Sequence, residues 1–434
     1  MGARDGQSSS NNELYLRLGL FASLIFAVEF LRGHVFGGLP WNLPGYIFPA
    51  GKPISQIASV IGIYGLSAVA VYVSAALAAL LYRRFVPAVG SALLLISLSG
   101  FGYIRLKNAD VQMVEGVKLR IVHANIPQRD KFDPQKYVET VNHYIRLSLS
   151  EGIEDVTHVI WPEGAVPGLM FEDPVLMQAL DRIFQAVPRK NLTAPPLLIA
   201  QSARSEKRAN GHTAYYNSAA AISFKQGSPP RLSGFYDKQK LVPFGEFIPA
   251  AGLLEKVGLH NLSTALESMS AGQSGDVPRI EGLPPLSLQI CYEIIFPGFT
   301  PALVSSGDGQ TMVKPEWILN LSNDSWYGNS TGPRQHVNQV RYRAIEEGLP
   351  VIRATSGGIS GTIDPYGRQI FTRLIGEDEV LDTPLPRYMK DNAYKRHFNA
   401  IIFLLNLLVL LGCFLLLRRS RRLHPLAPTL NIGL

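Results

Sequence analysis

The sequence predicts an α/β domain carried between membrane-spanning helices, three before it and one after it. Charged residues make up only 17% of the 434 residues and hydrophobic ones 47%, whereas roughly 25% charged residues is usual for soluble proteins. The apolar excess is concentrated towards the two ends of the chain. The middle instead alternates short β-rich runs with amphipathic stretches, the pattern typical of α/β folds.

Four apolar stretches are each long enough for the ~20 residues that cross a hydrocarbon core. They are residues 14–32, 57–82 and 85–104 before the middle region and residues 398–417 after it. Arg17 and Glu29 interrupt the first stretch, which makes it the weakest of the four. A buried helix of a soluble protein explains one such segment, but it does not explain three with basic ends.

Arginine placement predicts the orientation of these spans. Two arginines join the second and third spans, and four more follow the last span, so both places are expected in the cytoplasm. Cytoplasmic tails are therefore predicted at residues 1–13 and 418–434, a membrane domain at 14–105, and a domain outside the cytoplasmic membrane at 106–397. The polar start has no apolar h-region, so a cleaved signal peptide is not expected.

The external domain alternates predicted strands and helices. The strands are 117–126, 156–163, 194–203, 218–224, 283–292, 316–324 and 349–356, and the helices are 133–151, 174–187 and 334–348. Strands that are apolar on both faces and separated by helices indicate buried sheets. A region of this length can bury a large core without metal or disulfide support. With two cysteines, Cys291 and Cys413, the chain has no disulfide framework and no cysteine-based zinc cluster.

Three polar residues stand where apolar runs end: Glu163, Lys238 and Cys291. Open α/β sheets tend to place active sites at such ends. A thiol needs a base to become a thiolate, and it needs a cation or N–H donor to hold the oxyanion formed on a carbonyl. Each residue alone also has a structural interpretation. Glu163 could be an N-cap or surface acid, Lys238 a solvated lysine and Cys291 an inert core cysteine. Together they favour a thiol enzyme that needs no metal and no cofactor.

Several other signals point away from metal, nucleotide or nucleic-acid binding. The chain has no His-x-x-x-His pair with an intervening Glu, no Walker-type loop and no Gly-x-Gly-x-x-Gly after a strand. The run 357–361 is interpreted as a turn between strands, since it lacks the Gly-x-Ser-x-Gly spacing of a nucleophile elbow. Arg418–Arg422 is interpreted as a topology anchor beside anionic lipid. His336 could contact the site, but a structural role is favoured.

Several motifs together resemble the nitrilase, or carbon-nitrogen hydrolase, superfamily. They are WPEGAVPG (161–168), YDKQKLVPFGEFIP (236–249), CYE (291–293) and the long run 320–367. Within that superfamily they look like the apolipoprotein N-acyltransferase branch. The segment VEFLRGHVFGGLPWNLPGY (28–46) is similar to the part that precedes the nitrilase domain in that branch.

The resemblance implies a four-layer αββα sandwich and a role for each site residue. Glu163 would be the general base, Lys238 the oxyanion-side cation and Cys291 the nucleophile. Supporting positions would be Glu246, Tyr292 and Glu293. Candidates for substrate contact are Phe132, Trp161 and Trp326.

The implied reaction has two half-reactions. Cys291 would take an acyl chain from a membrane phospholipid as a thioester, and then give it to the α-amino group of the diacylglyceryl-cysteine at a lipoprotein N-terminus. The implied location is the bacterial inner membrane, as a multi-pass protein with the catalytic domain on the periplasmic side. Neither acyl-chain preference nor oligomeric state follows from these motifs.

Two departures from the family pattern leave alternatives open. Members of that branch have more spans than the four predicted here, and Phe132 stands where they usually have a tryptophan. A shortened nitrilase-like paralogue serving plasmid conjugal transfer is one alternative, and a membrane-tethered amidase acting on C–N bonds is another. A chain start upstream of Met1 would account for the absent spans without any change of function.

Overall fold

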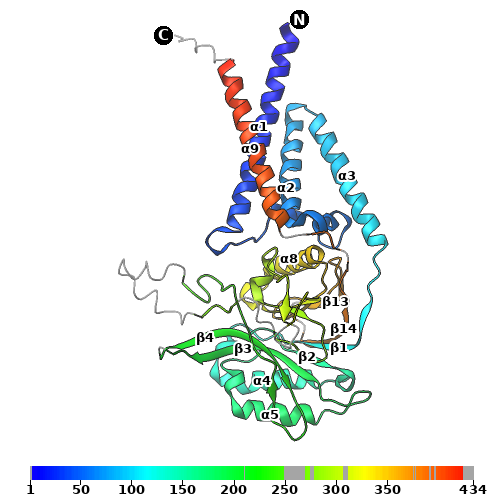
Figure 1. The fold of residues 1–434 in the computed structure, drawn as a ribbon, viewed down its shortest axis with the longest axis vertical. Helices are drawn as coiled ribbons and strands as arrows, with labels where there is room; N and C mark the ends of the chain where they lie inside the picture. Colours follow the sequence, from blue (N-terminus) through cyan, green and yellow to red (C-terminus); the bar gives the residue numbers. More distant parts are fainter. Residues whose placement is uncertain are drawn as a thin grey trace. The chain divides into compact units, whose positions relative to one another are not determined.

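The computed structural model describes two compact units. The described residues are 2–209, 211–248, 269–273, 278–305, 311–374, 376, 378–390, 392–394 and 397–423. The helical unit combines Met1–Ala109 with Asn392–Leu434, and the α/β unit is Asp110–Asp391 (Figure 1). The N-terminal and C-terminal parts of the chain therefore share one unit, and the middle forms the other.

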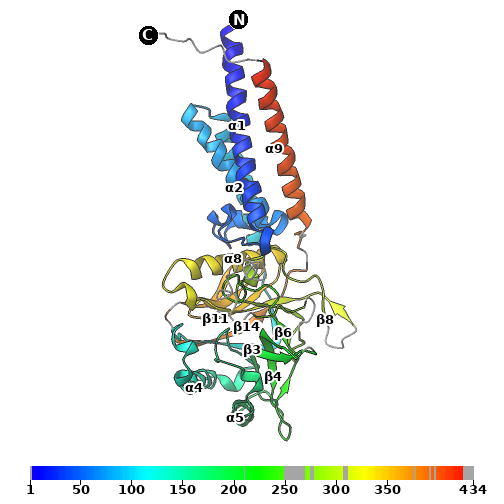
Figure 2. The same ribbon diagram turned by 90° about the vertical axis from the view of Figure 1, so that its left-hand side faces the viewer.

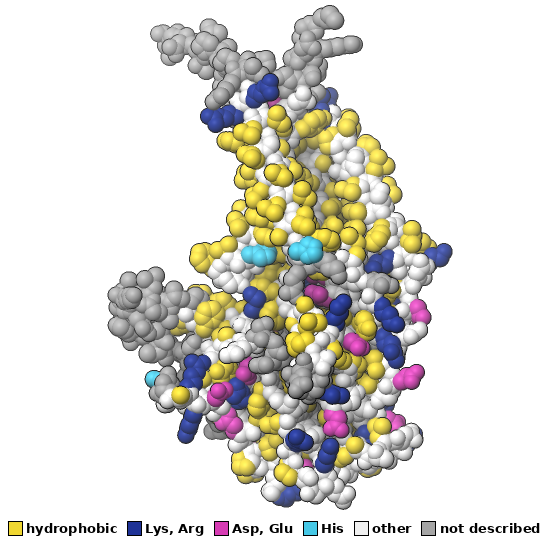
Figure 3. All heavy atoms as spheres, viewed as in Figure 1, with side chains coloured by type: hydrophobic (Ala, Val, Ile, Leu, Met, Phe, Trp, Pro, Cys, Tyr) yellow, Lys and Arg dark blue, Asp and Glu magenta, His cyan; other side chains and the backbone are white. Residues whose placement is uncertain are grey.

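The helical unit contains the predicted spans. Its long helices are α1 (Gly2–Arg32), α2 (Ala58–Ala78), α3 (Val86–Lys107) and α9 (His397–Leu423). Within the described residues, four segments are long and apolar enough to cross a membrane: Asn12–Arg32, Pro53–Tyr82, Val86–Lys107 and His397–Arg419. Hydrophobic side chains cover the visible face of this unit (Figure 3). Three spans before the α/β unit and one after it were predicted, and this order is confirmed; α1 also continues upstream of its predicted span.

A closed set of hydrogen bonds joins three of these helices. The Ser23 hydroxyl of α1 lies 2.6 Å from the Tyr72 hydroxyl of α2, which donates to Oδ1 of Asn406 in α9 at 3.0 Å. The Asn406 amide donates in turn to the carbonyl oxygen of Ser23 at 3.0 Å. α1 and α9 lie side by side along their length (Figure 2). Interhelical hydrogen bonds of this kind help to hold helices together where lipid surrounds them.

The connection between α1 and α2 is built from short 3-10 turns, of which η3 (Pro53–Ile57) packs against α3. Their close approach depends on Gly102. A β-carbon at this residue would lie 1.7 Å from the carbonyl oxygen of Pro53. The side chains of Arg105 and Gln56 add a hydrogen bond of 3.3 Å beside this contact.

The larger sheet of the α/β unit has seven strands among the described residues. Its order is β14-β1-β2-β3-β4-β5, with β6 also pairing with β4, and β1, β2 and β3 run parallel to one another. The strands are β1 (Met113–His123), β2 (His158–Ile160), β3 (Leu197–Lys207), β4 (Thr213–Ser223), β5 (Arg231–Leu232), β6 (Tyr236–Asp237) and β14 (Glu379–Pro386).

The smaller sheet has the order β13-β12-β11-β10-β7, in which β10 runs parallel to both β7 and β11. Its strands are β7 (Leu286–Ile290), β10 (Trp317–Asn323), β11 (Val351–Ser356), β12 (Ser360–Ile363) and β13 (Gln369–Arg373). In a separate two-stranded sheet, β8 (Val304–Ser305) pairs antiparallel with β9 (Met312–Val313). A turn was predicted at 357–361; residues 357–359 connect the antiparallel strands β11 and β12, and the last two residues of the predicted turn belong to β12.

The two sheets and their helices form four layers. α4 (Tyr137–Ser148) and α5 (Pro174–Gln185) cover the larger sheet, and Tyr144 and Phe184 from these helices are buried in a core with Trp161. α8 (Gly332–Glu347) packs against the smaller sheet. Figure 2 shows the order α8, smaller sheet, larger sheet, α4 and α5. This confirms the predicted α/β fold class with its four-layer order.

Candidate active site

Glu163 lies where the two sheets meet. It follows β2, a central strand of the larger sheet whose buried residues hold the chain in place up to this point. Its Oε1 accepts a hydrogen bond of 2.9 Å from the Asn217 side chain on β4. Its Oε2 accepts one of 2.9 Å from the main-chain N–H of Asn323, the last residue of β10 in the smaller sheet. Both carboxylate oxygens are thus fixed, each by a different sheet.

Lys238 is held beside this carboxylate by an edge strand. It directly follows β6, and its main-chain N–H donates to the carbonyl oxygen of Asn217 at 2.8 Å. The ammonium group donates to Oε1 of Glu246 at 2.8 Å and lies 3.7 Å from Oε1 of Glu163. Burial alone would lower the pKa of Lys238, but the negative charges around it, that of Glu163 first, outweigh burial and raise its pKa above the ordinary value. The lysine is therefore a fixed cation at neutral pH.

Cys291 directly follows β7 and begins the short helix η9 (Cys291–Ile295) in an unusual backbone conformation. Its φ of 55° lies in the left-handed region, which residues with a β-carbon rarely occupy unless surrounding structure imposes it. The Asn320 side chain on β10 donates to the carbonyl oxygen of Cys291 at 3.2 Å and helps to impose it. The residue is buried, with 9% of its surface exposed.

The charges of Glu163 and Lys238 affect the pKa of the Cys291 thiol. Burial raises the pKa of the Cys291 thiol, the charge of Glu163 raises it further, and the charge of Lys238 lowers it, with a net rise. The thiol is consequently protonated at neutral pH. The structure thus brings Cys291, Glu163 and Lys238 into one electrostatically coupled group.

Three further predicted residues surround this group. Glu246 bridges it, because its Oε1 also accepts from the Asn217 side chain at 2.9 Å while its Oε2 accepts from the Val242 main chain at 2.8 Å. Tyr292 donates to the carbonyl oxygen of Leu241 at 2.5 Å, and its ring centre lies 5.6 Å from Nζ of Lys238.

Glu293 is fully buried, and its carboxylate accepts hydrogen bonds from several main-chain N–H groups. Its Oε1 accepts from the N–H groups of Gln239 and Lys240 at 2.7 and 2.9 Å. Its Oε2 accepts from the N–H of Ile290 at 2.7 Å and from the Tyr236 hydroxyl at 2.9 Å. The segment that carries Lys238 is thereby tied to the turn that carries Cys291. Burial raises the pKa of Glu293 to about 7, against the opposing effect of these donors.

A cavity of about 1020 Å³ is lined by Glu163 of this group and by Glu246 beside it. Its polar lining includes Lys131, Glu163, Asn217, Glu246 and Asn323, and its apolar lining includes Val138, Val166, Leu169, Met269 and Trp326. The structure therefore places Trp326 in the cavity wall. Trp161 lies in the core instead, fully buried, with its Nε1 donating to the Ser148 hydroxyl at 2.8 Å. The side chain of Phe132 lies outside the described part of the structure.

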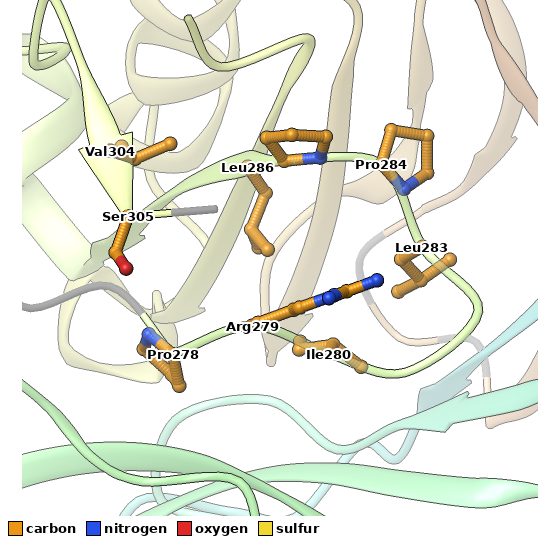
Figure 4. Close-up of a pocket in the computed structure, with 9 residues that line it drawn as sticks. Pro278, Arg279, Ile280, Leu283, Pro284, Leu286, Val304 and Ser305 are labelled. Carbon is orange, nitrogen blue, oxygen red and sulfur yellow. The ribbon is translucent and has the colours of Figure 1, made fainter. Parts of the chain in front are cut away.

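A second cavity has a different character. It measures about 100 Å³ and is lined by Pro278, Arg279, Ile280, residues 283–286, Val304 and Ser305 (Figure 4). This lining contains no carboxylate, no thiol and no predicted site residue. In addition, no three His, Cys, Asp or Glu side chains among the residues described are grouped to hold a metal ion. The larger cavity is accordingly the candidate active site.

Comparison of the sequence with known proteins identifies the family to which this chain belongs. Residues 118–381 match the carbon-nitrogen hydrolase family, and residues 8–76 match the apolipoprotein N-acyltransferase N-terminal domain. The apolipoprotein N-acyltransferase of Bradyrhizobium diazoefficiens is 38% identical over 394 residues, covering 87% of this chain and 69% of that protein. The chain belongs to the apolipoprotein N-acyltransferase family.

Further apolipoprotein N-acyltransferases show similar agreement. That of Rhodopseudomonas palustris is 36% identical over 394 residues, with 87% of this chain and 69% of the relative covered. That of Caulobacter vibrioides is 34% identical over 404 residues, with 91% and 72% covered. The carbon-nitrogen hydrolase match begins in β1 and ends in β14, so it takes in both sheets and every residue of the candidate site.

Sequence reasoning missed several polar residues of this N-acyltransferase family site. Asn217 touches both Glu163 and Glu246 from within a strand, where no motif marks it. Lys131 lines the cavity although its sequence neighbours are polar and suggest a surface loop. The only usable signal for Lys131 was its place in the turn after an apolar strand.

A buried ionic cluster behind Cys291 was also missed. Arg353 pairs with Asp324 at 2.6 Å and donates to the Asn320 side chain, which holds the Cys291 carbonyl. His336 completes the cluster, with its Nδ1 2.9 Å from Oδ1 of Asp324. Burial lowers the pKa of His336, although the negative charge of Asp324 opposes this effect. His336 therefore supports the turn from behind, which agrees with the structural role favoured above.

Proposed function

We propose that this protein moves an acyl chain from a phospholipid to Cys291 as a thioester, and then to the α-amino group of a lipoprotein's N-terminal diacylglyceryl-cysteine. The observation that supports this most directly is the grouping of Glu163, Lys238 and Cys291, in which Glu163 lines a large cavity, in a chain of this family. The name of the relatives, apolipoprotein N-acyltransferase, supports the class of acceptor.

In the first half-reaction, Cys291 attacks the ester carbonyl of the donor lipid. Because its thiol is protonated at rest, a base must take the proton as the S–C bond forms, and Glu163 is positioned for this. The charge of Lys238 stabilises the negative oxygen of the tetrahedral intermediate. When the acyl C–O bond breaks, the proton on Glu163 passes to the departing lipid alkoxide.

In the second half-reaction, the acceptor amine attacks the thioester carbonyl. The amine loses a proton to Glu163 as the C–N bond forms, and the C–S bond then breaks. The proton on Glu163 returns to the sulfur, which restores the starting enzyme. The hydrogen bonds to both oxygens of Glu163 hold its carboxylate in one orientation for both half-reactions.

The cavity supports a lipid donor. Apolar side chains such as Val138, Leu169 and Trp326 line it, and an acyl chain gains free energy by leaving water for such walls, at about 0.8 kcal/mol per buried CH₂. The four apolar helices would hold the enzyme in the bilayer that contains its substrates. We place the α/β unit on the periplasmic side of the inner membrane, as the arginines at the other ends of the spans predict.

Incubation of the purified protein with phospholipid carrying a labelled acyl chain tests this function. We expect a hydroxylamine-sensitive label on the protein that Cys291→Ala abolishes and that Cys413→Ala, at the other thiol of the chain, retains. Addition of a diacylglyceryl-cysteine peptide should then move the label to the peptide as an amide. Label released as free fatty acid would indicate a hydrolase instead, and the absence of any label on folded wild-type protein would overturn the proposal.

A further inference from the structure

Lys131 is a buried amine in the wall of the active-site cavity. It belongs to η5 (Asp130–Phe132), between β1 and α4, and only 3% of its surface is exposed. Its Nζ donates to Oδ1 of Asn323 at 2.6 Å and to the Ser325 hydroxyl at 3.0 Å. It lines the same cavity as Glu163.

The contacts of Lys131 fit a neutral amine. An ammonium group has three N–H donors, whereas the neutral amine has two donors and a lone pair. Among the described residues, two acceptors take hydrogen bonds from the nitrogen, and the residue lines the cavity. Burial lowers the pKa of Lys131 to about 7, although the negative charges of Glu163 and Asp324, the charged groups that face it, oppose this effect. Near neutral pH the nitrogen can therefore both hold and release a proton.

The second half-reaction needs a proton acceptor that the first does not. A free α-amino group has a pKa of about 7.7–8.0, so the acceptor arrives largely as an ammonium ion that cannot attack a carbonyl. Glu163 is already committed to the proton that the nitrogen loses while the C–N bond forms. A second base near the thioester would remove the first proton before attack.

We propose that Lys131 is a catalytic residue of the second half-reaction, and that its neutral amine takes the proton from the ammonium group of the acceptor. This inference rests on the proposed function. The acceptor's N–H bond breaks and an N–H bond forms on Lys131, which becomes an ammonium ion. The neutral acceptor then attacks, its second proton travels through Glu163 to the sulfur, and Lys131 returns its proton to water in the cavity. Each proton is thus accounted for, and no other reactant is required.

A purely positioning role for Lys131 makes different predictions. Lys131 holds the Asn323 side chain, and the main-chain N–H of Asn323 holds Glu163. If Lys131 acted only through this contact, its loss would slow both half-reactions alike, and an arginine that kept the charge and the donors would restore them. An arginine cannot give up its proton in a protein, so it cannot act as a base.

The test measures the two half-reactions separately, in single turnovers of the full chain in detergent or vesicles. Acylation is followed with labelled phospholipid, and transfer is followed by adding the diacylglyceryl-cysteine peptide to the isolated acyl-enzyme. Lys131→Met and Lys131→Arg should both slow transfer by about 100-fold, since general bases contribute about 10²–10⁴-fold, and should slow acylation at least tenfold less. Lys136→Met, which removes an exposed lysine paired with Glu139, is the control and should change neither rate.

The pH dependence gives a second readout. The wild-type transfer rate should rise through about pH 7 as Lys131 loses its proton, whereas transfer by both variants should rise only as the acceptor amine itself deprotonates. The proposal would be overturned if the Lys131→Arg variant transferred the acyl chain at the wild-type rate. It would also be overturned if the acylation and transfer rates of Lys131→Met fell by the same factor. Failure of the wild-type protein to form any acyl-enzyme would instead refute the proposed function and this inference together.

Discussion

At the scale of single residues, Asn217 shows how the site holds two carboxylates close together. One amide nitrogen donates to both Glu163 and Glu246 at 2.9 Å. The orientation of this amide is fixed because its oxygen accepts from Gln201 at 2.7 Å. The shared donor offsets the repulsion between the two negative charges, and Lys238 supplies the positive charge between them.

Replacement of Asn217 should therefore impair acylation without unfolding the protein. We expect Asn217→Ala to slow acyl-enzyme formation by about 10- to 100-fold, since removal of a single catalytic donor costs a comparable factor or more elsewhere. Asn217→Asp should be slower still, because it places a third carboxylate beside the other two. Thermal unfolding of each variant controls for folding, and an Asn217→Asp enzyme as fast as wild type would contradict this account.

Sequence reasoning reached the residues that end strands but not those that project from them. Glu163 and Cys291 follow strongly apolar runs, and the placement of both at sheet ends follows from that pattern alone. Asn217 has no such marker, since its importance arises from the pairing of β4 with β3 and β6. Lys131 depends on burial by residues more than 190 positions away in the chain, which no local pattern contains.

At the scale of elements, the turn after β7 is held by side chains and main chain from several neighbouring segments. Glu293 accepts four hydrogen bonds there, two from the segment after β6 and one from the end of β7, with the Tyr236 hydroxyl as the fourth. Asn320 holds the same turn from β10. The left-handed backbone of Cys291 thus persists because both neighbouring segments fix it.

Glu293→Gln should loosen this turn. An amide presents one oxygen where the carboxylate presents two, so at least one buried main-chain donor loses its acceptor, at a cost of about 1–3 kcal/mol. We expect a lower unfolding midpoint in detergent and slower acylation. Glu293→Ala is a poor alternative because it also leaves a cavity.

The pH dependence of stability gives a sharper check on Glu293. Its pKa is raised from 4.5 to about 7 in the folded protein, so the folded state binds more protons than the unfolded state between these values. The stability that protonation of Glu293 adds to the folded state is fully present below about pH 4.5, and it is lost as the pH rises through about 7. This decline should be smaller in Glu293→Gln, and an identical decline in both proteins would contradict the assignment.

The strands that escaped prediction are short or partly polar. β6 has two residues and β5 has two, too few for an alternating pattern. β13 alternates between intermediate and exposed positions and contains no fully buried residue. The long apolar strands were predicted as strands, because burial on both faces gives each a continuous hydrophobic run. Their observed ends differ from the predicted ends by a few residues.

At the scale of the whole molecule, hydropathy located the spans but not their partners. Apolar composition identifies a helix that can cross a membrane, and it says nothing about which helices touch. The contacts depend instead on isolated polar side chains, of which Ser23, Tyr72 and Asn406 form the clearest set. The family resemblance likewise predicted the order of the layers, which the strand pattern alone left open.

Loss of the Asn406 amide should weaken the association of α9 with α1 and α2. We expect Asn406→Leu to lower the free energy of unfolding of the helical unit by about 0.6–2 kcal/mol, the range found for hydrogen bonds between membrane helices. The matched control is Leu408→Ala, because Leu408 is 65% exposed while Asn406 is 5% exposed. Thermal unfolding in one detergent compares them, and equal midpoints for the two variants would argue against the network.

The contact between α3 and the Pro53 carbonyl bears on natural variation in this protein. A methyl group at residue 102 would overlap the main-chain carbonyl of Pro53, so even alanine does not fit at this position. Leu93 and Ile96 of the same helix are 61% and 67% exposed and have no such neighbour. Mutational drift should therefore exchange apolar residues freely at those two sites while residue 102 stays glycine.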